Sequence, residues 1–224
     1  MPAIPRIMLS LVAALCVAVL GLLLSTQLTA AAASSVPPSA QPSDFVSTWD
    51  TTKTSSGSSL ANQIRLPLSG EGPYDFTVDW GDGSVSRITR STQPETTHTY
   101  ASSGVYTLAV SGTIRGWRFA GSGDRLKIQN ISQWGDLRLG DQGDYFRGAS
   151  SLTADAQDSL NLIGTSNLSG MFRDASSFNG DVSGWDTSNV TDMYAMFSRA
   201  SSFNGDVSGW DTGSVTDMSG TFQG

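Results

Sequence analysis

Cysteine and histidine are nearly absent from this sequence of 224 residues, which contains only Cys16 and His98. One cysteine cannot form an intrachain disulfide. A structural zinc site needs about four cysteine or histidine ligands, and no Gly-x-Ser-x-Gly motif accompanies His98 to suggest a Ser-His-Asp triad. We therefore predict that the protein is not an enzyme, that it binds no cofactor or metal, and that His98 is an ordinary strand residue.

Positive charge is also scarce. The chain has 13 lysine and arginine residues against 20 aspartate and glutamate residues, a net charge of -7, and only 15% of its residues are charged. Nucleic-acid phosphates require a basic patch, so no nucleic-acid partner is expected. The 24 glycines favour a turn-rich β or repeat architecture over a helical bundle.

The N-terminal region has the order of a secretory signal peptide. Arg6 precedes an apolar run over residues 7–24, and small residues follow up to Ala33. We predict a signal peptide at residues 1–33, which places the protein outside the cell or at its surface. The alternative is an uncleaved membrane anchor, because the run of 18 residues reaches the lower limit for spanning a bilayer. Residues 34–43, rich in Pro and Ser, are predicted to be a linker.

Residues 44–120 contain short alternating runs separated by Gly, Asp and Pro, which predict a small antiparallel β-sandwich. The expected strands are residues 63–68, 75–80, 85–90, 96–100 and 104–114. Alternate apolar residues should face inward, namely Phe76, Val78 and Trp80 in one strand, and Val105, Leu108, Val110 and Ile114 in another.

A Gly-Asp-Gly-Ser segment at residues 81–84 joins two of these strands. Asp82 and Gly83 favour a tight two-residue hairpin turn, because both residue types tolerate positive φ. A calcium site at Asp79 and Asp82 is the weaker alternative, since two carboxylates lack a clear third ligand.

The segment FTVDWGDGS, followed by THTY at residues 97–100 and GVYTLAVSG at residues 104–112, resembles the polycystic kidney disease (PKD) domain. That domain is a β-sandwich of extracellular proteins. The resemblance covers about 40 residues in a diagnostic order. It implies a spacer that contacts protein or sugar and has no catalytic activity of its own.

Two near-identical repeats occupy residues 171–195 and 196–220 and agree at 19 of 25 positions. A fixed period of this length is typical of leucine-rich-repeat solenoids, in which each unit stacks on its neighbour. Weaker copies extend upstream, so we expect an array over residues 129–224. Its irregular units should occupy residues 129–170, and a partial repeat residues 221–224.

The apolar positions that do not change between the copies are predicted to form the core. In the first copy they are Met171, Phe172, Ala175, Phe178, Val182, Trp185, Val190 and Met193. Sugar stacking is the weaker alternative for Trp185 and its counterpart Trp210. The variable positions are polar, small or tyrosine and should form the outer surface. The candidate binding residues among them are Ser188, Asn189, Tyr194, Gly213, Ser214 and Ser219.

Local structure within a repeat is expected to combine a short helix with a short strand. Met171, Phe172 and Ala175 have the spacing of one helical face, and Asp192 is suited to cap the next helix. The stacking strand is either residues 182–185 or residues 190–193. The predicted fold class is therefore mainly β, an Ig-like sandwich followed by a leucine-rich-repeat-like solenoid of short strands and short helices.

Three aspartates of the first repeat recur in the second, so stacking should align them in columns: Asp181, Asp186, Asp192, Asp206, Asp211 and Asp217. Their Gly, Ser, Thr and Asn neighbours favour Asx turns. Calcium bound between Asp181 and Asp206 is a weaker alternative, and glycoside hydrolysis by paired carboxylates is weaker still.

The repeat sequence SSFNGDVSGWDTSNVTDM, followed by MF, closely resembles the BspA-like leucine-rich repeat surface proteins. ISQWGDL and YFRGASSL upstream are similar to the segment that opens their arrays. The resemblance implies a cell-surface protein associated with adhesion and with binding to a host or matrix. Ligands differ between members, so no particular ligand is implied.

The sequence stops four residues into a third copy, with Thr221 where the repeat has Met. We expect a fragment or a truncated reading frame, in which further repeats or a partner cover the open apolar face. The predicted function is adhesion or recognition of an extracellular protein or glycan, in association with the cell envelope. The alternatives are a structural envelope stalk without a ligand and the non-catalytic part of a larger secreted hydrolase.

Overall fold

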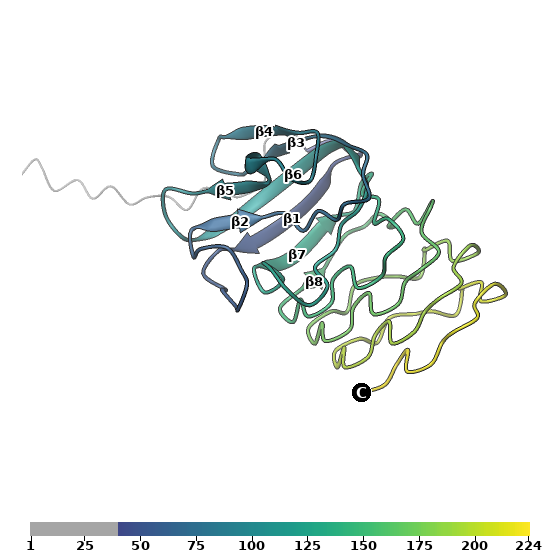
Figure 1. Cartoon of the computed structure of the whole chain (residues 1–224). Coiled ribbons are helices and arrows are strands. Elements are labelled where there is room, and N and C mark those ends of the chain that lie inside the picture. Colours follow the sequence, from purple (N-terminus) through teal and green to yellow (C-terminus); the bar gives the residue numbers. More distant parts are fainter. Residues whose placement is uncertain (1–39) are drawn as a thin grey trace, which may run out of the picture. The chain divides into compact units, whose positions relative to one another are not determined.

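A six-stranded sheet and a two-stranded sheet form the N-terminal part of residues 40–224, the range described by the computed structural model (Figure 1). The strand order is β4-β3-β6-β1-β7-β8 in the first sheet and β2-β5 in the second. The predicted signal peptide and most of the predicted linker lie outside the described residues. Within residues 40–224, no helix has the length and apolar character needed to cross a membrane.

The described residues are mainly β. The elements are β1 (Phe45–Asp50), β2 (Gln63–Arg65), β3 (Tyr74–Asp79), β4 (Val85–Ile88), the 3-10 turn η1 (Pro94–Thr96), β5 (Thr97–Thr99), β6 (Val105–Ile114), β7 (Ile128–Gln133) and β8 (Thr153–Ala154). Paired strands are antiparallel except β7 and β8, which run parallel. The five predicted strands correspond to β2 to β6, whereas β1, β7 and β8 were not predicted.

The inward-facing residues of β3 and most of those of β6 are as predicted. Phe76, Val78, Leu108 and Val110 are all buried. Val105 is the exception, since 59% of its surface is exposed. Val105 begins β6 and pairs with the last residue of β1, whereas the pairing of β6 with β3 does not extend that far.

The connection between β3 and β4 is longer than the predicted two-residue turn. The last strand pair is Asp79 with Val85, which leaves five residues, 80–84, in the loop. Gly83 has the expected positive φ of 88°, but the other positive φ, 77°, belongs to Gly81. A side chain at Gly81 would overlap the carbonyl group of Thr107, so close packing against β6 determines the loop.

Four fully buried tryptophans dominate the core, and they link the sheets to the C-terminal repeats: Trp49, Trp80, Trp117 and Trp134. The ring centroids of Phe45 and Trp117 lie 5.1 Å apart in an edge-on contact. Trp134 makes edge contacts with Phe146 at 5.9 Å and with Trp185 at 6.0 Å. One continuous apolar core therefore runs from the sheets into the repeats.

A buried ion pair anchors the long loop between β1 and β2. The side chains of Lys127 and Asp124 are both fully buried, with Nζ 3.5 Å from Oδ2. Lys127 Nζ also donates to the Ser59 hydroxyl at 2.7 Å and to the carbonyl oxygens of Leu60 and Gln63 at 2.8 Å each. Burial lowers the pKa of Lys127, while Asp124 opposes that shift. Hydrogen-bond partners from the protein therefore replace the water that would surround the Lys127 ammonium group in solution.

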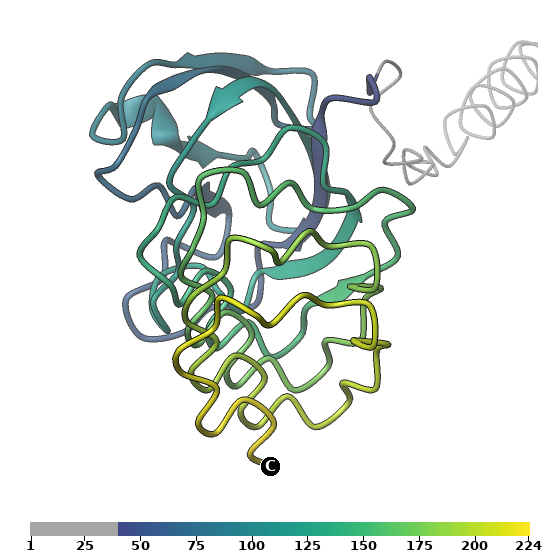
Figure 2. The same cartoon turned by 90° about the vertical axis from the view of Figure 1, so that its right-hand side faces the viewer.

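Successive coils of the C-terminal region are joined by backbone hydrogen bonds between residues about one repeat apart. The N–H of Phe146 donates to Met171, that of Phe172 to Met196, and that of Phe197 to Thr221, each at 2.8 Å. Figure 2 shows these coils stacked one above another. Chain segments one repeat apart therefore lie side by side, as parallel strands do in a sheet.

Phenylalanine rings stack in a column through these coils. The rings of Phe146, Phe172, Phe197 and Phe222 follow one another at centroid distances of 5.6, 5.6 and 5.7 Å and lie within 14° of parallel. All eight predicted core positions of the first repeat are buried. In the second repeat the same positions become more exposed toward the C-terminus, and Met218 is 44% exposed.

The short helices predicted within the repeats are absent, and residues 171–174 form consecutive turns. The N–H groups of Phe172 and Asp174 donate to Met196 and Ser198 of the next coil, at 2.8 and 2.9 Å. The intervening N–H groups close turns within their own coil. Because alternate N–H groups point along the stacking direction, the continuous bonding of an α-helix cannot form.

Residues 190–193, not 182–185, supply the extended segment of each repeat. Asp192 forms isolated parallel bridges with Asn167 on one side and Asp217 on the other. Its carboxylate accepts the N–H of Tyr194 at 2.8 Å, so Asp192 closes a local turn and does not cap a helix.

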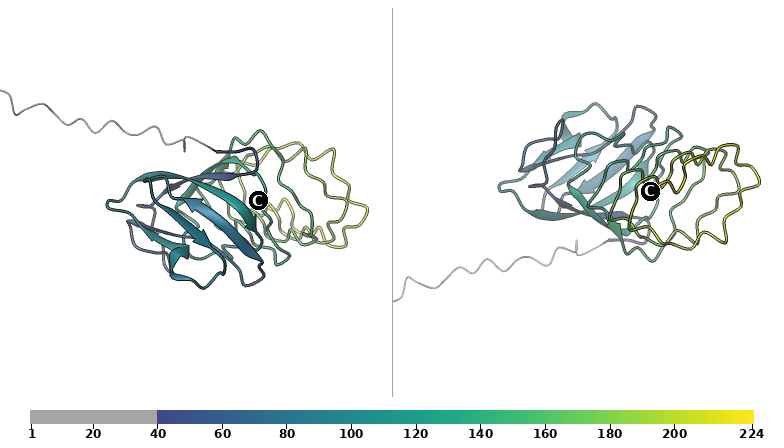
Figure 3. Two further views of the ribbon diagram at one scale, coloured as in Figure 1. Left: turned by 90° about the horizontal axis from the view of Figure 1, so that it is seen from above. Right: turned by 90° about the horizontal axis from the view of Figure 1, so that it is seen from below.

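β7 occupies the place where the array was expected to begin. It pairs with β1 on one side and with β8 on the other, so residues 129–133 form a strand of the large sheet. Contacts between coils start earlier, since the N–H of Trp117 donates to Leu139 and that of Phe119 to Tyr145, both at 3.0 Å. Figure 3 shows that the coils continue from the edge of the sheet formed by β7 and β8.

Removing a ring from the middle of the phenylalanine column should lower the free energy of unfolding much more than removing the last ring. Phe172→Ala should lower the free energy of unfolding by about 3–5 kcal/mol, because it leaves a cavity between two stacked rings. Phe222→Ala, at a position that is 55% exposed, should cost less than about 1 kcal/mol. Urea unfolding followed by tryptophan fluorescence measures both, and equal losses would contradict the column.

Removing the buried ammonium should also destabilise the fold. Lys127→Met leaves Asp124 buried without its partner and should cost about 3–5 kcal/mol. The exposed Lys53→Met serves as the control and should change stability by less than about 0.5 kcal/mol. Adding Asp124→Asn to Lys127→Met should recover part of the loss, because it removes the unpaired charge and keeps an oxygen that can accept one of the N–H groups of Ser59 and Arg65. No recovery would show that the ion pair is not the relevant interaction.

Candidate binding surface

The variable positions chosen from the sequence lie on the outside of the coils. Ser188, Asn189, Gly213 and Ser214 belong to one turn in two successive coils, and the Ser214 hydroxyl donates to the Ser188 carbonyl at 3.1 Å. Tyr194 lies five residues further along and is 47% exposed. The structure therefore places these residues at the surface but distributes them over two separate turns.

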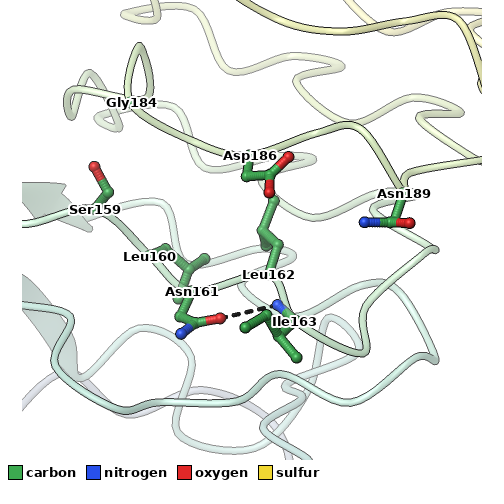
Figure 4. A pocket seen from close by; sticks show the side chains of 8 residues that line it. All are labelled: Ser159, Leu160, Asn161, Leu162, Ile163, Gly184, Asp186 and Asn189. Carbon is green, nitrogen blue, oxygen red and sulfur yellow. Dashed lines mark hydrogen bonds between the residues drawn. The ribbon is translucent and has the colours of Figure 1, made fainter.

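Asn189 stands out because it lines two neighbouring hollows. The first, of about 300 Å³, is formed by the residues drawn in Figure 4: Ser159, Leu160, Asn161, Leu162, Ile163, Gly184, Asp186 and Asn189. The second, of about 430 Å³, is lined by Asp141, Ile163, Gly164, Thr165, Ser166 and Asn189. Ile163 and Asn189 are common to both, so we treat the two hollows as one groove, called the Asn189 groove.

Most of the Asn189 groove was not predicted from the sequence. Asn161 and Ile163 lie in an irregular unit that has no matching copy, so comparison between repeats could not identify them. Ile163 is 77% exposed, the largest exposed fraction of any large apolar side chain among residues 40–224. The N–H of Ile163 donates to the Asn161 side-chain oxygen at 2.9 Å, and this bond orients the Asn161 amide. The one feature of the sequence that could have indicated this groove is Ile163 itself, an apolar residue outside the apolar pattern of the repeats.

Variation between the repeats at positions 174 and 199 has a structural cause. Asp174 and Arg199 occupy equivalent places in adjacent coils, and Arg199 Nε lies 2.6 Å from Asp174 Oδ1. The hydrogen bond from Arg199 lowers the pKa of the Asp174 carboxyl below its ordinary value. Identical charges would repel at this spacing, so opposite charges explain the difference without a ligand.

The repeated aspartates form Asx turns, as their neighbours suggested. The Asp181 carboxylate accepts the N–H and hydroxyl of Ser183 at 2.9 and 2.7 Å, and Asp206 accepts the N–H of Ser208 at 2.8 Å. These bonds lower the pKa of both carboxyls below the ordinary value of 3.8. Among residues 40–224, no three His, Cys, Asp or Glu side chains gather as a metal site would require.

His98 contacts both an aspartate and a serine, but not as a catalytic triad. Its Nε2 lies 2.8 Å from Asp82 and 3.4 Å from the Ser84 hydroxyl, so one ring nitrogen faces both partners. A triad needs the aspartate and the serine on opposite nitrogens. Partial burial raises the pKa of Asp82, but hydrogen bonds from Ser84 and His98 lower it by more. Together with stacking on Trp80 at 4.8 Å, these contacts tie the β3–β4 loop to β5.

The calcium candidate Asp79 is also occupied locally, since its carboxylate accepts the N–H of Gly81 at 2.9 Å. Trp185 is buried, which places it in the core as predicted and leaves no face for a sugar. Trp210 stacks on it at 6.4 Å and donates its indole N–H to Val182 at 2.9 Å. Neither tryptophan belongs to the Asn189 groove.

Acid should destabilise the coils through the Asx turns. The pKa values of Asp181 and Asp206 are depressed by folding, so their stabilisation is present above pH 3.8 and is lost as the pH falls through the folded-state values. The melting temperature should therefore fall between pH 7 and about pH 2.5. Ser183→Ala should reduce this acid-induced fall by removing one donor to Asp181. A fall of the same size in that variant would contradict the assignment.

Comparison with known proteins identifies a similar family for the coils only. Residues 118–224, just under half of the chain, match the family described as Mycoplasma protein of unknown function, DUF285. No curated protein matches the chain. No solved structure matches it. The match begins next to Phe119, where the contacts between coils begin, so the coils are the part of this chain that is similar to DUF285.

Proposed function

We propose that this protein is a secreted or cell-surface adhesion or recognition protein without catalytic activity. In this proposal the coils are a solenoid of BspA-like leucine-rich repeats, and the N-terminal strands are a PKD-like β-sandwich that serves as a spacer. The ligand is an extracellular protein or glycan. The N-terminal sequence supports export, because Arg6, the apolar run and the small residues up to Ala33 have the order of a signal peptide.

The observation that carries this proposal is that the apolar positions shared by the two repeats are buried in the first, whereas most positions that differ lie at the surface, with Ala195 and Ser198 as buried exceptions. The eight unchanged apolar positions of the first repeat are buried. Asn189 differs from its counterpart Ser214 and lines the groove. A scaffold that keeps its core and changes its surface is suited to recognition, and repetition of weak contacts raises avidity.

A structural stalk without a ligand is the competing function. The unbroken core and the ion pair between Asp174 and Arg199 support it, because both stiffen the array without requiring a partner. A non-catalytic part of a larger secreted hydrolase is the third possibility. A binding experiment separates the first two.

The purified chain should bind at least one class of ligand on an array of glycans and extracellular matrix proteins. Asn189→Ala should weaken that binding about fivefold, the effect of one lost hydrogen bond. Asn204→Ala is the matched control, because Asn204 is an exposed asparagine of the same array and lines neither hollow. The absence of binding to every class would favour the stalk, and equal effects of the two substitutions would move recognition away from the groove.

A further inference from the structure

A third hollow, separate from the Asn189 groove, is lined by Arg65 and Arg118. Its volume is about 420 Å³, within the range of small-ligand pockets. The rest of its lining consists of Gly57, Leu66, Pro67, Leu68, Phe119, Ser122, Gly123 and Asp124. Asp124 adds no free charge, because its side chain is fully buried and pairs with Lys127. The hollow therefore presents the charge of two arginines.

A shared carboxylate links Arg118 to a third arginine, Arg147. Arg118 Nη2 lies 3.2 Å from Asp144 Oδ2, and Arg147 Nη1 lies 3.5 Å from the same oxygen. The two arginine side chains remain 31% and 36% exposed. One negative charge is thus divided between two positive charges, and the three side chains together stay positive.

Two neighbouring glycines place Arg125 beside Arg147. A Cβ added at Gly121 would lie 3.5 Å from Arg147 Nε, and a Cβ added at Gly148 would lie 2.9 Å from Arg125 Nε. The second of these added atoms would also lie 3.5 Å from the Cα of Gly121. The two arginine side chains therefore lie side by side over a pair of adjacent glycines, where a larger residue would displace them.

The loop between β1 and β2 connects Arg125 back to Arg65. Arg125 Nη1 donates to the Ser55 hydroxyl at 3.1 Å, and Arg65 Nη2 donates to the Gly57 carbonyl at 2.8 Å. Both acceptors are neutral, and neither arginine forms an ion pair within residues 40–224.

We call the four residues Arg65, Arg118, Arg125 and Arg147 the arginine cluster. Asp144 is the one carboxylate that pairs with any of them in the described part of the chain. Positive charge is therefore concentrated at this place in a chain whose net charge is -7. Like charges held close together repel, so an anionic ligand would be attracted to the cluster.

The chemistry of the hollow favours a sugar that carries several anionic groups. Pro67 and Leu68 are half-buried and offer an apolar surface for the C–H face of a sugar ring. The exposed Ser122 offers a hydroxyl to the ring hydroxyls. An acidic sugar ring has a single carboxylate, whereas a ring can carry more than one sulfate. Several guanidinium groups around one hollow therefore match a sulfated sugar better.

We propose that the arginine cluster binds a sulfated polysaccharide, with a sugar ring in the hollow and its sulfate groups on the guanidinium groups. Arginine suits this role because its planar fork makes two parallel hydrogen bonds to an oxyanion and never loses its charge. The inference rests on the proposed recognition function and names a ligand class for it. It uses a surface other than the Asn189 groove.

Calorimetry on the purified full chain tests the proposal, with heparin oligosaccharides as the probe. The fully desulfated oligosaccharides keep their carboxylates and should bind at least about tenfold more weakly. Arg65→Gln and Arg125→Gln should each weaken binding of the sulfated probe about tenfold, because each removes charge-assisted hydrogen bonds. Binding should also weaken as the salt concentration rises, since salt screens charges at the surface.

Arg90→Gln is the matched control. Arg90 is exposed and lines none of the three hollows, and its substitution removes the same single charge as Arg65→Gln. It should change the affinity less than about twofold, because its charge acts only through screened long-range attraction. An equal loss in Arg90→Gln and Arg65→Gln would show that net charge, and not the cluster, attracts the probe.

The other outcomes also decide the matter. No binding of the sulfated probe, or equal binding of its desulfated form, would overturn the assignment. Binding of oligoglutamate or of a DNA oligonucleotide as tight as that of heparin would overturn the saccharide in favour of an acidic peptide or a nucleic acid. In each case a ligand on the glycan and matrix array whose binding depends on Asn189 would leave the proposed recognition function standing, whereas a negative array would reject that function as well.

Discussion

Backbone hydrogen bonds between chain segments one repeat apart support the C-terminal region, and they begin within the sheet. β7 is antiparallel to β1 but parallel to β8, so the pairing changes at β7 from antiparallel to parallel. The coils continue the same direction, with the bond from Phe172 to Met196 repeated by Phe197 to Thr221. Without this ladder the apolar face of each coil would be exposed, because one coil is too thin to bury it alone.

The ladder also explains which residues are free to vary. Side chains that point into the stack meet their own copies, and a flat ring such as Phe172 stacks well on an identical ring. Side chains that point outward meet copies of themselves at the same spacing, which disfavours repeated charge unless the signs alternate, as in Asp174 and Arg199.

Much of the candidate surface could not have been found in the sequence. Asn189 was identified because two nearly identical copies reveal a variable position. Ile163 and Asn161 lie in a unit with no copy, so comparison between copies could not reveal them.

The sequence alone determined the mainly β character, five of the strands and the buried positions of the first repeat, because alternation and exact repetition report burial directly. Tertiary structure decided the rest. β1 is buried along most of its length, and β7 has polar residues 129 and 130 between its buried Ile128 and Ile131, so neither strand alternates clearly. The predicted helices became turns because the N–H groups of Phe172 and Asp174 bond to the next coil. Local spacing cannot reveal that competition, since it depends on a partner strand that only the folded chain supplies.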